Sequence, residues 1–149
     1  MKLVGCILIV ISSIYASHIY EKSLKKAIKN TSDLYSLIIH IKAQIEYFAL
    51  PISKIFSDYT SENEAIIDIL TKKENADLSY LSEQTMETTY SLLSELGKGF
   101  KKEQVALCEH TASVINDYKE YLNSELSKKI KISRSFCLFI GACTIILLV

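Results

Sequence analysis

Apolar and polar positions divide the chain into three parts. Both ends are almost entirely apolar, whereas the middle mixes apolar and charged residues at the three- and four-residue spacing of amphipathic α-helices. Residues 3–19 and 135–149 contain no formally charged side chain. This division predicts an all-α protein in which an antiparallel helical bundle lies between two transmembrane helices, each continuous with a long first or last helix of the bundle.

Each apolar end is close to the length that a membrane span needs. As a helix, residues 3–19 would extend about 26 Å, against about 30 Å for a hydrocarbon core, and the last segment counted from Ile132 reaches about 27 Å. We therefore expect transmembrane helices at 1–20 and 132–149 and a bundle domain at 21–131. Two buried core helices are an alternative, but the rest of the chain is too short to cover two helices that are apolar all round.

A cleaved signal peptide is a second alternative for the first apolar segment. Lys2 is the one basic residue before the segment, where a signal peptide usually has a positively charged region. Ile14 and Tyr15 are bulky where a cleavage site needs small residues. We interpret the segment as a retained helix.

Basic residues lie beside both apolar ends, and they predict which side of the membrane the central domain faces. Positively charged flanks stay on the cytoplasmic side of a membrane, where they also attract anionic lipid headgroups. We therefore expect the central domain to face the cytoplasm. This basic collar consists of Lys22, Lys25, Lys26, Lys29, Lys128, Lys129, Lys131 and Arg134.

The first long helix should end near the one proline of the chain. Apolar residues recur at steps of three and four from Leu24 to Phe48, so we expect the helix to continue to Leu50. Pro51 disfavours helical backbone in the residue before it and is well placed to open a short helix.

The rest of the central region predicts shorter helices and one long final helix. Ser61 and Glu64 have the spacing of a capping box, which predicts a helix start. The polar segment 71–77 is expected to be a loop, followed by a helix at 78–96. The apolar spacing resumes at Lys102 and meets the last apolar segment without a glycine or proline between them.

Composition supports the helical reading. Four glycines and one proline are too few for the many tight turns of a β-sandwich or barrel, and Gly97 is placed to stop a helix. Seventeen basic and seventeen acidic residues give zero net charge, which argues against a nucleic-acid binder. Residues 58–125, however, hold fourteen acids against six lysines, so we expect a partner with a basic patch.

No set of residues predicts catalysis. The three histidines and four cysteines lack metal-ligand or disulfide spacing, and no phosphate-binding loop is present. We therefore expect no enzymatic activity, metal or cofactor.

Two short motifs carry a family resemblance. Gln44-Ile45-Glu46-Tyr47 leads into Pro51, and Leu96-Gly97 precedes the final long helix. With the layout of the whole chain, these motifs resemble the stage III sporulation protein AB family. That family is similar to the platform proteins of type II secretion (the type II secretion F proteins) and type IV pilus machines.

The resemblance implies a non-enzymatic part of the channel complex between mother cell and forespore. It places the protein in the mother-cell membrane around the forespore, with other sporulation channel proteins and an ATPase, stage III sporulation protein AA, as partners. Glu46, Tyr47, Pro51 and Gly97 are then candidates for a docking surface. The structural alternative is that Tyr47 packs beside Phe48, Glu46 pairs locally and Gly97 serves only the turn.

Two other functions remain open at this point. The chain could be a generic membrane-anchored coiled-coil interaction or signalling module, in which case the central region could form a homo-oligomer. It could also be an exported domain if the orientation is opposite.

Overall fold

The computed structural model describes the backbone of residues 2–48 and 50–148, and side chains at 11, 15, 18–48, 50–73, 75–132 and 135. Every regular element in this part of the chain is helical, which confirms the predicted all-α class. The elements are α1 (Lys2–Ala43), the π-helix η1 (Gln44–Phe48), α2 (Ile52–Asp58), α3 (Glu64–Lys72), the 3-10 helix η2 (Lys73–Asn75), α4 (Glu83–Glu95) and α5 (Lys101–Leu148).

The chain divides into two compact units. The central unit is Ala27–Tyr121, and the terminal unit combines Met1–Lys26 with Leu122–Val149. The helices α1 and α5 contribute to both units, whereas all the shorter helices belong to the central unit.

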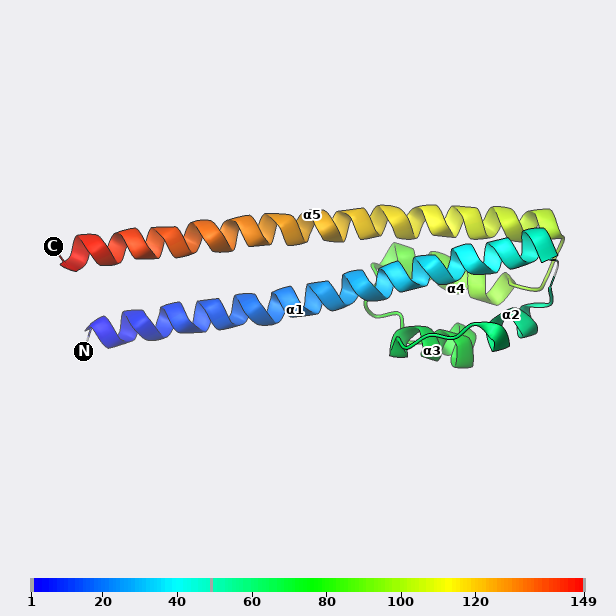
Figure 1. Ribbon diagram of the computed structural model, residues 1–149, viewed down its shortest axis with the longest axis horizontal. Coiled ribbons are helices and arrows are strands. Elements are labelled where there is room, and N and C mark those ends of the chain that lie inside the picture. Colours follow the sequence, from blue (N-terminus) through cyan, green and yellow to red (C-terminus); the bar gives the residue numbers. More distant parts are fainter. Residues whose placement is uncertain (1, 49, 149) are drawn as a thin grey trace. The chain divides into compact units, whose positions relative to one another are not determined.

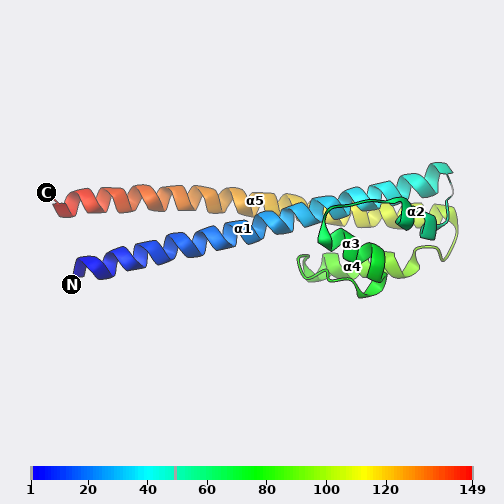
Figure 2. The same ribbon diagram turned by 60° about the horizontal axis from the view of Figure 1, so that its bottom comes forward.

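Within the central unit the helices form an antiparallel bundle. The chain runs along α1, returns through α2 and α3, runs forward again along α4 and returns along α5 (Figures 1 and 2). In this unit α1 contacts α5 at both Lys42, whose Nζ lies 2.7 Å from Glu109 Oε1, and Tyr35, whose ring centroid lies 4.9 Å from Lys119 Nζ. The predicted helical bundle is therefore confirmed.

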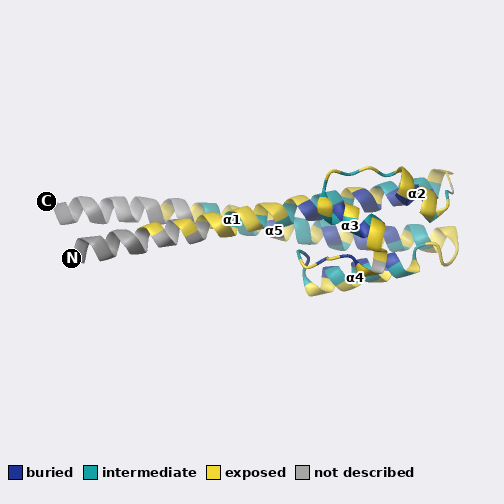
Figure 3. Cartoon of the chain, turned by 90° about the horizontal axis from the view of Figure 1, so that it is seen from below, coloured by how far each residue is buried: buried dark blue, intermediate teal, exposed yellow. Residues whose placement is uncertain are grey.

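The core of the bundle is built mainly from aliphatic side chains. They come from every helix of the central unit that has more than three residues, and Figure 3 shows the buried positions as bands along α1, α4 and α5. The apolar spacing that predicted the long helices is the spacing of these buried residues. The largest fully buried side chains are Leu34, Leu37, Ile38, Ile41, Ile55, Ile66, Ile69, Leu78, Leu92, Ile115, Thr31 and Thr89.

Threonines occupy several core positions without leaving a hydroxyl unpaired. Thr31, Thr89 and Thr111 are buried, and the Oγ1 of each donates to the backbone carbonyl four residues earlier, at 2.8, 2.7 and 2.9 Å. Since a buried hydroxyl is costly only when it has no hydrogen bond, these threonines present their methyl groups to the core.

The end of the first long helix differs from the prediction. The α-helix stops at Ala43 and continues as a π-helix, not as an α-helix to Leu50. Because a π-turn holds more residues than an α-turn, Ile45 is buried while Phe48, three residues later, is exposed. Pro51 has extended backbone, with φ −66° and ψ 142°, and is the N-cap of α2 rather than its first residue.

The predicted capping box of Ser61 and Glu64 is wrong. Asn63 is the N-cap of α3, and its Oδ1 accepts a backbone N–H of the first turn at 3.0 Å. Its Nδ2 donates to Asn30 Oδ1 at 3.1 Å and to Asp33 Oδ2 at 2.6 Å, both on α1. A contact between α3 and α1 thus accompanies the use of Asn63, rather than Ser61, as the N-cap. The spacing of residues along the chain does not reveal such a contact.

The segment predicted as a loop at 71–77 is partly helical. The helix α3 continues to Lys72, and Lys73 then has a positive φ of 51° at the start of η2. The loop follows η2 instead, and it begins with the buried Ala76.

The fourth helix is shorter than the predicted 78–96. It begins at Glu83, after the N-cap Ser82, whose Oγ accepts a backbone N–H of the first turn at 3.3 Å. Leu78 and Leu81 are buried as predicted, but from the preceding loop. Their apolar side chains therefore fasten the loop to the core.

In the terminal unit, described apolar side chains are exposed on both long helices. They are Ile11, Tyr15, Ile19, Tyr20 and Ile132. Within the described side chains, no stretch of helix is long and apolar enough to cross a membrane. The spans expected at 1–20 and 132–149 lie mostly outside those side chains, so they remain predictions.

Candidate functional site

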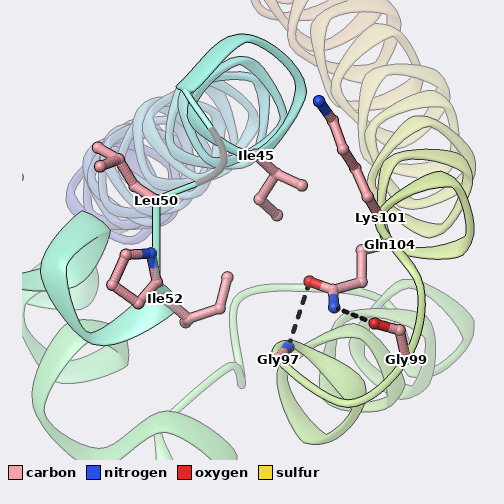
Figure 4. Close-up of a pocket in the computed structure, with 8 residues that line it drawn as sticks. Ile45, Leu50, Ile52, Gly97, Gly99, Lys101 and Gln104 are labelled. Carbon is pink, nitrogen blue, oxygen red and sulfur yellow. Dashed lines mark hydrogen bonds between the residues drawn. The ribbon is translucent and has the colours of Figure 1, made fainter.

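Two chain turns meet at one end of the central unit, which we call the turn end. Here η1 leads to α2 and α4 leads to α5. A Cβ added to Gly97 would lie 3.5 Å from Ile52 Cγ1, so the two turns are in contact. They enclose a pocket of about 350 Å³ (Figure 4), lined by Ile45, Leu50, Pro51, Ile52, Gly97, Gly99, Lys101 and Gln104.

The turn between α4 and α5 depends on two glycines and on the first residues of α5. Gly97 and Gly99 have φ of 88° and 125°, which L-residues with a Cβ rarely adopt. Gln104 bridges them: its Oε1 accepts the N–H of Gly97 at 3.3 Å, and its Nε2 donates to the carbonyl of Gly99 at 3.1 Å. Glu103 Oε2 accepts the N–H of Phe100 at 3.1 Å. These bonds give the turn a defined shape beside the pocket.

The π-helix directs neighbouring side chains to opposite sides. Ile45 is buried and lines the pocket. Tyr47 and Phe48 are 75% and 66% exposed, so neither belongs to the core. Phe100, beside the glycine turn, is 79% exposed. Segments that line the pocket therefore also carry three exposed aromatic rings.

Glu46 lies near an ion pair between the two long helices. The carboxylate of Glu109 holds the pKa of Lys42 above its ordinary value, and the negative charge of Glu46 adds to this effect. Glu46 is half-buried, so it is positioned by the fold at the edge of the exposed aromatic pair.

Lysines are concentrated at the glycine turn. Lys98, Lys101 and Lys102 are all exposed, and they are three of the six lysines in the acidic stretch 58–125. Within the part of the chain that the structure describes, no carboxylate forms an ion pair with any of the three. With Glu95 and Glu103 on the same turn, residues 95–104 hold three lysines against two acids, a small positive net charge within the acidic stretch.

The basic collar is exposed wherever its side chains are described. Lys25 pairs with Glu21 at 2.6 Å, and Lys128 pairs with Glu125 at 2.9 Å. Lys129 Nζ lies 3.8 Å above the ring centroid of Tyr20. The side chain of the predicted collar member Arg134 lies outside the described residues.

The described residues include no cluster of metal-ligating side chains, and the cysteine described among them is buried. Among them, no three His, Cys, Asp or Glu side chains could hold a metal ion together. The thiol of Cys108 is buried, and burial raises its pKa to about 11, which keeps it neutral at physiological pH.

Sequence reasoning identified part of this site. Of the four predicted residues, Pro51 and Gly97 line one pocket, and Glu46 and Tyr47 lie on the π-helix beside it. The predicted site residues did not include the other lining residues of the pocket or Phe100. One signal could have revealed Phe100, because an aromatic residue directly after a glycine turn has no helix face to pack against.

The fold and this site define a helical-bundle protein with a pocket and exposed aromatic rings at one end of the bundle. The family model of stage III sporulation protein AB matches residues 2–74, about half of the chain. This match confirms the predicted resemblance: over residues 2–74 the chain is similar to the stage III sporulation protein AB family, which points to a role in sporulation. No curated protein and no solved structure gives a significant match to the chain.

Proposed function

We propose that the protein is a non-enzymatic membrane platform in the sporulation channel complex between mother cell and forespore. In this proposal the terminal helices anchor it in the mother-cell membrane, and the central unit docks a cytoplasmic ATPase, stage III sporulation protein AA. The family match over residues 2–74 supports the role in sporulation, and the remaining steps rest on the surfaces described above.

The observation that carries the docking proposal is the exposed aromatic pair Tyr47 and Phe48. Large aromatic side chains are enriched among the residues that dominate binding energy in protein interfaces, and leaving two neighbours in water gives no benefit to the fold. Both lie in the segment that matches the family. The pair therefore marks the surface that a partner covers.

The membrane proposal is supported by side chains near the collar. Ile11, Tyr15 and Ile19 recur every four residues on α1 and are exposed, so they form one apolar helix face. The collar lysines follow directly, as expected where a helix leaves the apolar layer and reaches anionic headgroups.

A pull-down from mild detergent tests the docking proposal. The full chain should retain purified stage III sporulation protein AA, and the double variant Y47A/F48A should retain at least tenfold less, because it removes both aromatic anchors. Tyr121→Ala is the matched control, since Tyr121 is also exposed but lies on α5. Failure of the folded wild-type chain to bind the folded ATPase would overturn the docking proposal.

Cysteine labelling in intact cells tests the orientation. Glu62 is exposed in the central unit, so Glu62→Cys is introduced after Cys6, Cys108, Cys137 and Cys143 are replaced by serine. A membrane-impermeant maleimide should label this position only after the cells are permeabilised. Labelling of intact cells would place the central unit on the outer side.

A further inference from the structure

We infer that the pocket at the turn end receives a segment of the docked partner in which a large apolar side chain lies next to carboxylates. This inference rests on the proposed docking function and specifies its chemistry. It concerns the pocket itself, whereas the docking proposal concerns the exposed aromatic pair.

The walls of the pocket are suited to an apolar side chain. Ile45 and Ile52 face it from one side, and Lys101 and Gln104 come from the other (Figure 4). A volume of about 350 Å³ is at the small end of the range of ligand sites, about 300–1,000 Å³. It therefore fits one or two side chains of a bound segment.

The polar side of the pocket attracts an anion. Lys101 lines the pocket, and Lys98 and Lys102 flank it on the same turn. Two acids share the turn with these lysines: Glu103 already bonds the N–H of Phe100, and Glu95 forms no ion pair with them in the described part of the chain, so three lysines stand against two carboxylates. The free lysines thus favour carboxylates here, although the rest of 58–125 is acidic and repels them.

Exposed aromatic rings extend the apolar surface beyond the pocket. Phe48 and Phe100 are 66% and 79% exposed, and they belong to the two turns that form the walls. A free small anion would contact the lysines but would cover neither ring. A protein segment that is both apolar and acidic would satisfy the lysines, the walls and the rings together.

A labelled peptide tests this inference on the full chain in mild detergent. The probe is a fluorescein-labelled peptide with the core Glu-Glu-Leu-Phe-Glu-Glu, followed by fluorescence anisotropy. One comparison peptide replaces Leu-Phe by Ser-Ser, and another replaces every Glu by Lys. We expect saturable binding of the first peptide only, weakened at least fivefold when salt is raised from 50 to 500 mM, roughly from a 14 Å to a 4 Å screening length.

Two variants locate the binding. Lys101→Glu should weaken peptide binding at least fivefold, and Ile52→Trp should weaken it similarly by filling the pocket, into which Ile52 points (Figure 4). Lys54→Glu is the matched charge control, because Lys54 is exposed on α2 and does not line the pocket. Circular dichroism verifies folding, and because Lys101 is exposed, the Lys101→Glu variant keeps the test valid if Ile52→Trp does not fold.

The outcomes separate this inference from the proposed docking function. Absence of peptide binding, or equal binding by wild type and Lys101→Glu, overturns the pocket inference even if the ATPase is retained in the pull-down. Peptide binding that is lost in Lys101→Glu but kept in Lys54→Glu supports it. If the peptide binds in this way while the ATPase does not, only the choice of partner is wrong.

Discussion

The central and terminal units use the same two long helices in opposite ways. Between residues 27 and 121, α1 and α5 bury their apolar faces against the shorter helices, so that Ile41 and Ile115 are fully covered. In the terminal unit Ile11, Tyr15, Ile19 and Tyr20 of α1 are exposed to solvent, Ile19 to 54%. Leu122 is the one buried residue among its described side chains.

The difference separates a unit that supplies its own core from one that does not. The shorter helices provide the second apolar layer that a stable bundle needs. The terminal unit has only the long helices, and exposed apolar faces of this kind mark contacts with a membrane or another protein. Stability should therefore reside in the central unit, whereas the terminal unit should depend on its surroundings.

The largest expected effect comes from replacing an isoleucine of α1 in the central unit, compared with the same replacement in the terminal unit. Ile41→Ala should lower the free energy of unfolding of the central unit by about 2–5 kcal/mol, because it leaves a cavity in the core. Ile19→Ala should change it by less than about 0.5 kcal/mol. Urea unfolding followed by circular dichroism measures both, and equal losses would contradict the division into units.

The interhelical cap gives the next largest effect. Asn63→Ala should destabilise the central unit by about 1–2 kcal/mol, since it removes the N-cap of α3 and its bonds to Asn30 and Asp33. Asn123→Ala is the control, because Asn123 is exposed on α5 in the terminal unit. If Asn63→Ala lowered the free energy of unfolding no more than its control does, the contact with α1 would not stabilise the central unit.

Alkaline unfolding sharpens the comparison through Tyr80. Its hydroxyl is buried without a hydrogen-bond partner in the described part of the chain, and burial, with the nearby charge of Asp77, raises its pKa. The unfolded chain then loses this proton first, so stability is complete below about pH 10 and falls as the pH rises further.

Tyr80→Phe should therefore make the central unit less sensitive to pH above about 10. At pH 7 the variant should be unchanged or more stable by up to about 1 kcal/mol, because it removes an unpaired polar group. Tyr121→Phe, at an exposed position, should leave the pH profile unchanged. Urea midpoints measured from pH 7 to 11 provide the comparison, and identical profiles for both variants would show that Tyr80 is not the responsible group.

The smallest expected effect compares two cation–π contacts. Lys119 lies 4.9 Å from the ring of Tyr35 in the central unit, and Lys129 lies 3.8 Å from that of Tyr20 in the terminal unit. Lys119→Ala should lower the stability of the central unit by about 0.5–1 kcal/mol, whereas Lys129→Ala should leave its urea midpoint unchanged. A larger shift for Lys129→Ala would mean that the two units unfold together.

The sequence predicted the helices whose burial follows a regular period. The spacing from Thr31 to Ile45 and from Val105 to Leu122 corresponds to buried or half-buried positions in α1 and α5, because a 3.6-residue period leaves little other choice. Gly97 was recognisable as a helix stop, since few residues tolerate its φ of 88°.

The departures have tertiary causes. Asn63 is the cap of α3 because α1 supplies partners for its amide, and Leu78 is buried in a loop because it packs on the core. The pocket is assembled from two turns that lie far apart in the sequence. Local patterns contain no information about which turn meets which, so the motifs contained Ile45, Pro51 and Gly97 without showing that the three line one pocket.

The antiparallel pairing of α1 and α5 has a mechanical consequence. Residue 35 lies opposite residue 119, and residue 42 lies opposite residue 109, so the chain enters and leaves the central unit at the same end. A pulling force on residues 27 and 121 would separate α1 from α5 one contact at a time, starting at the pulled end. It would break the contact of Lys119 with Tyr35 before the ion pair of Lys42 with Glu109. The turn end would bear the force last.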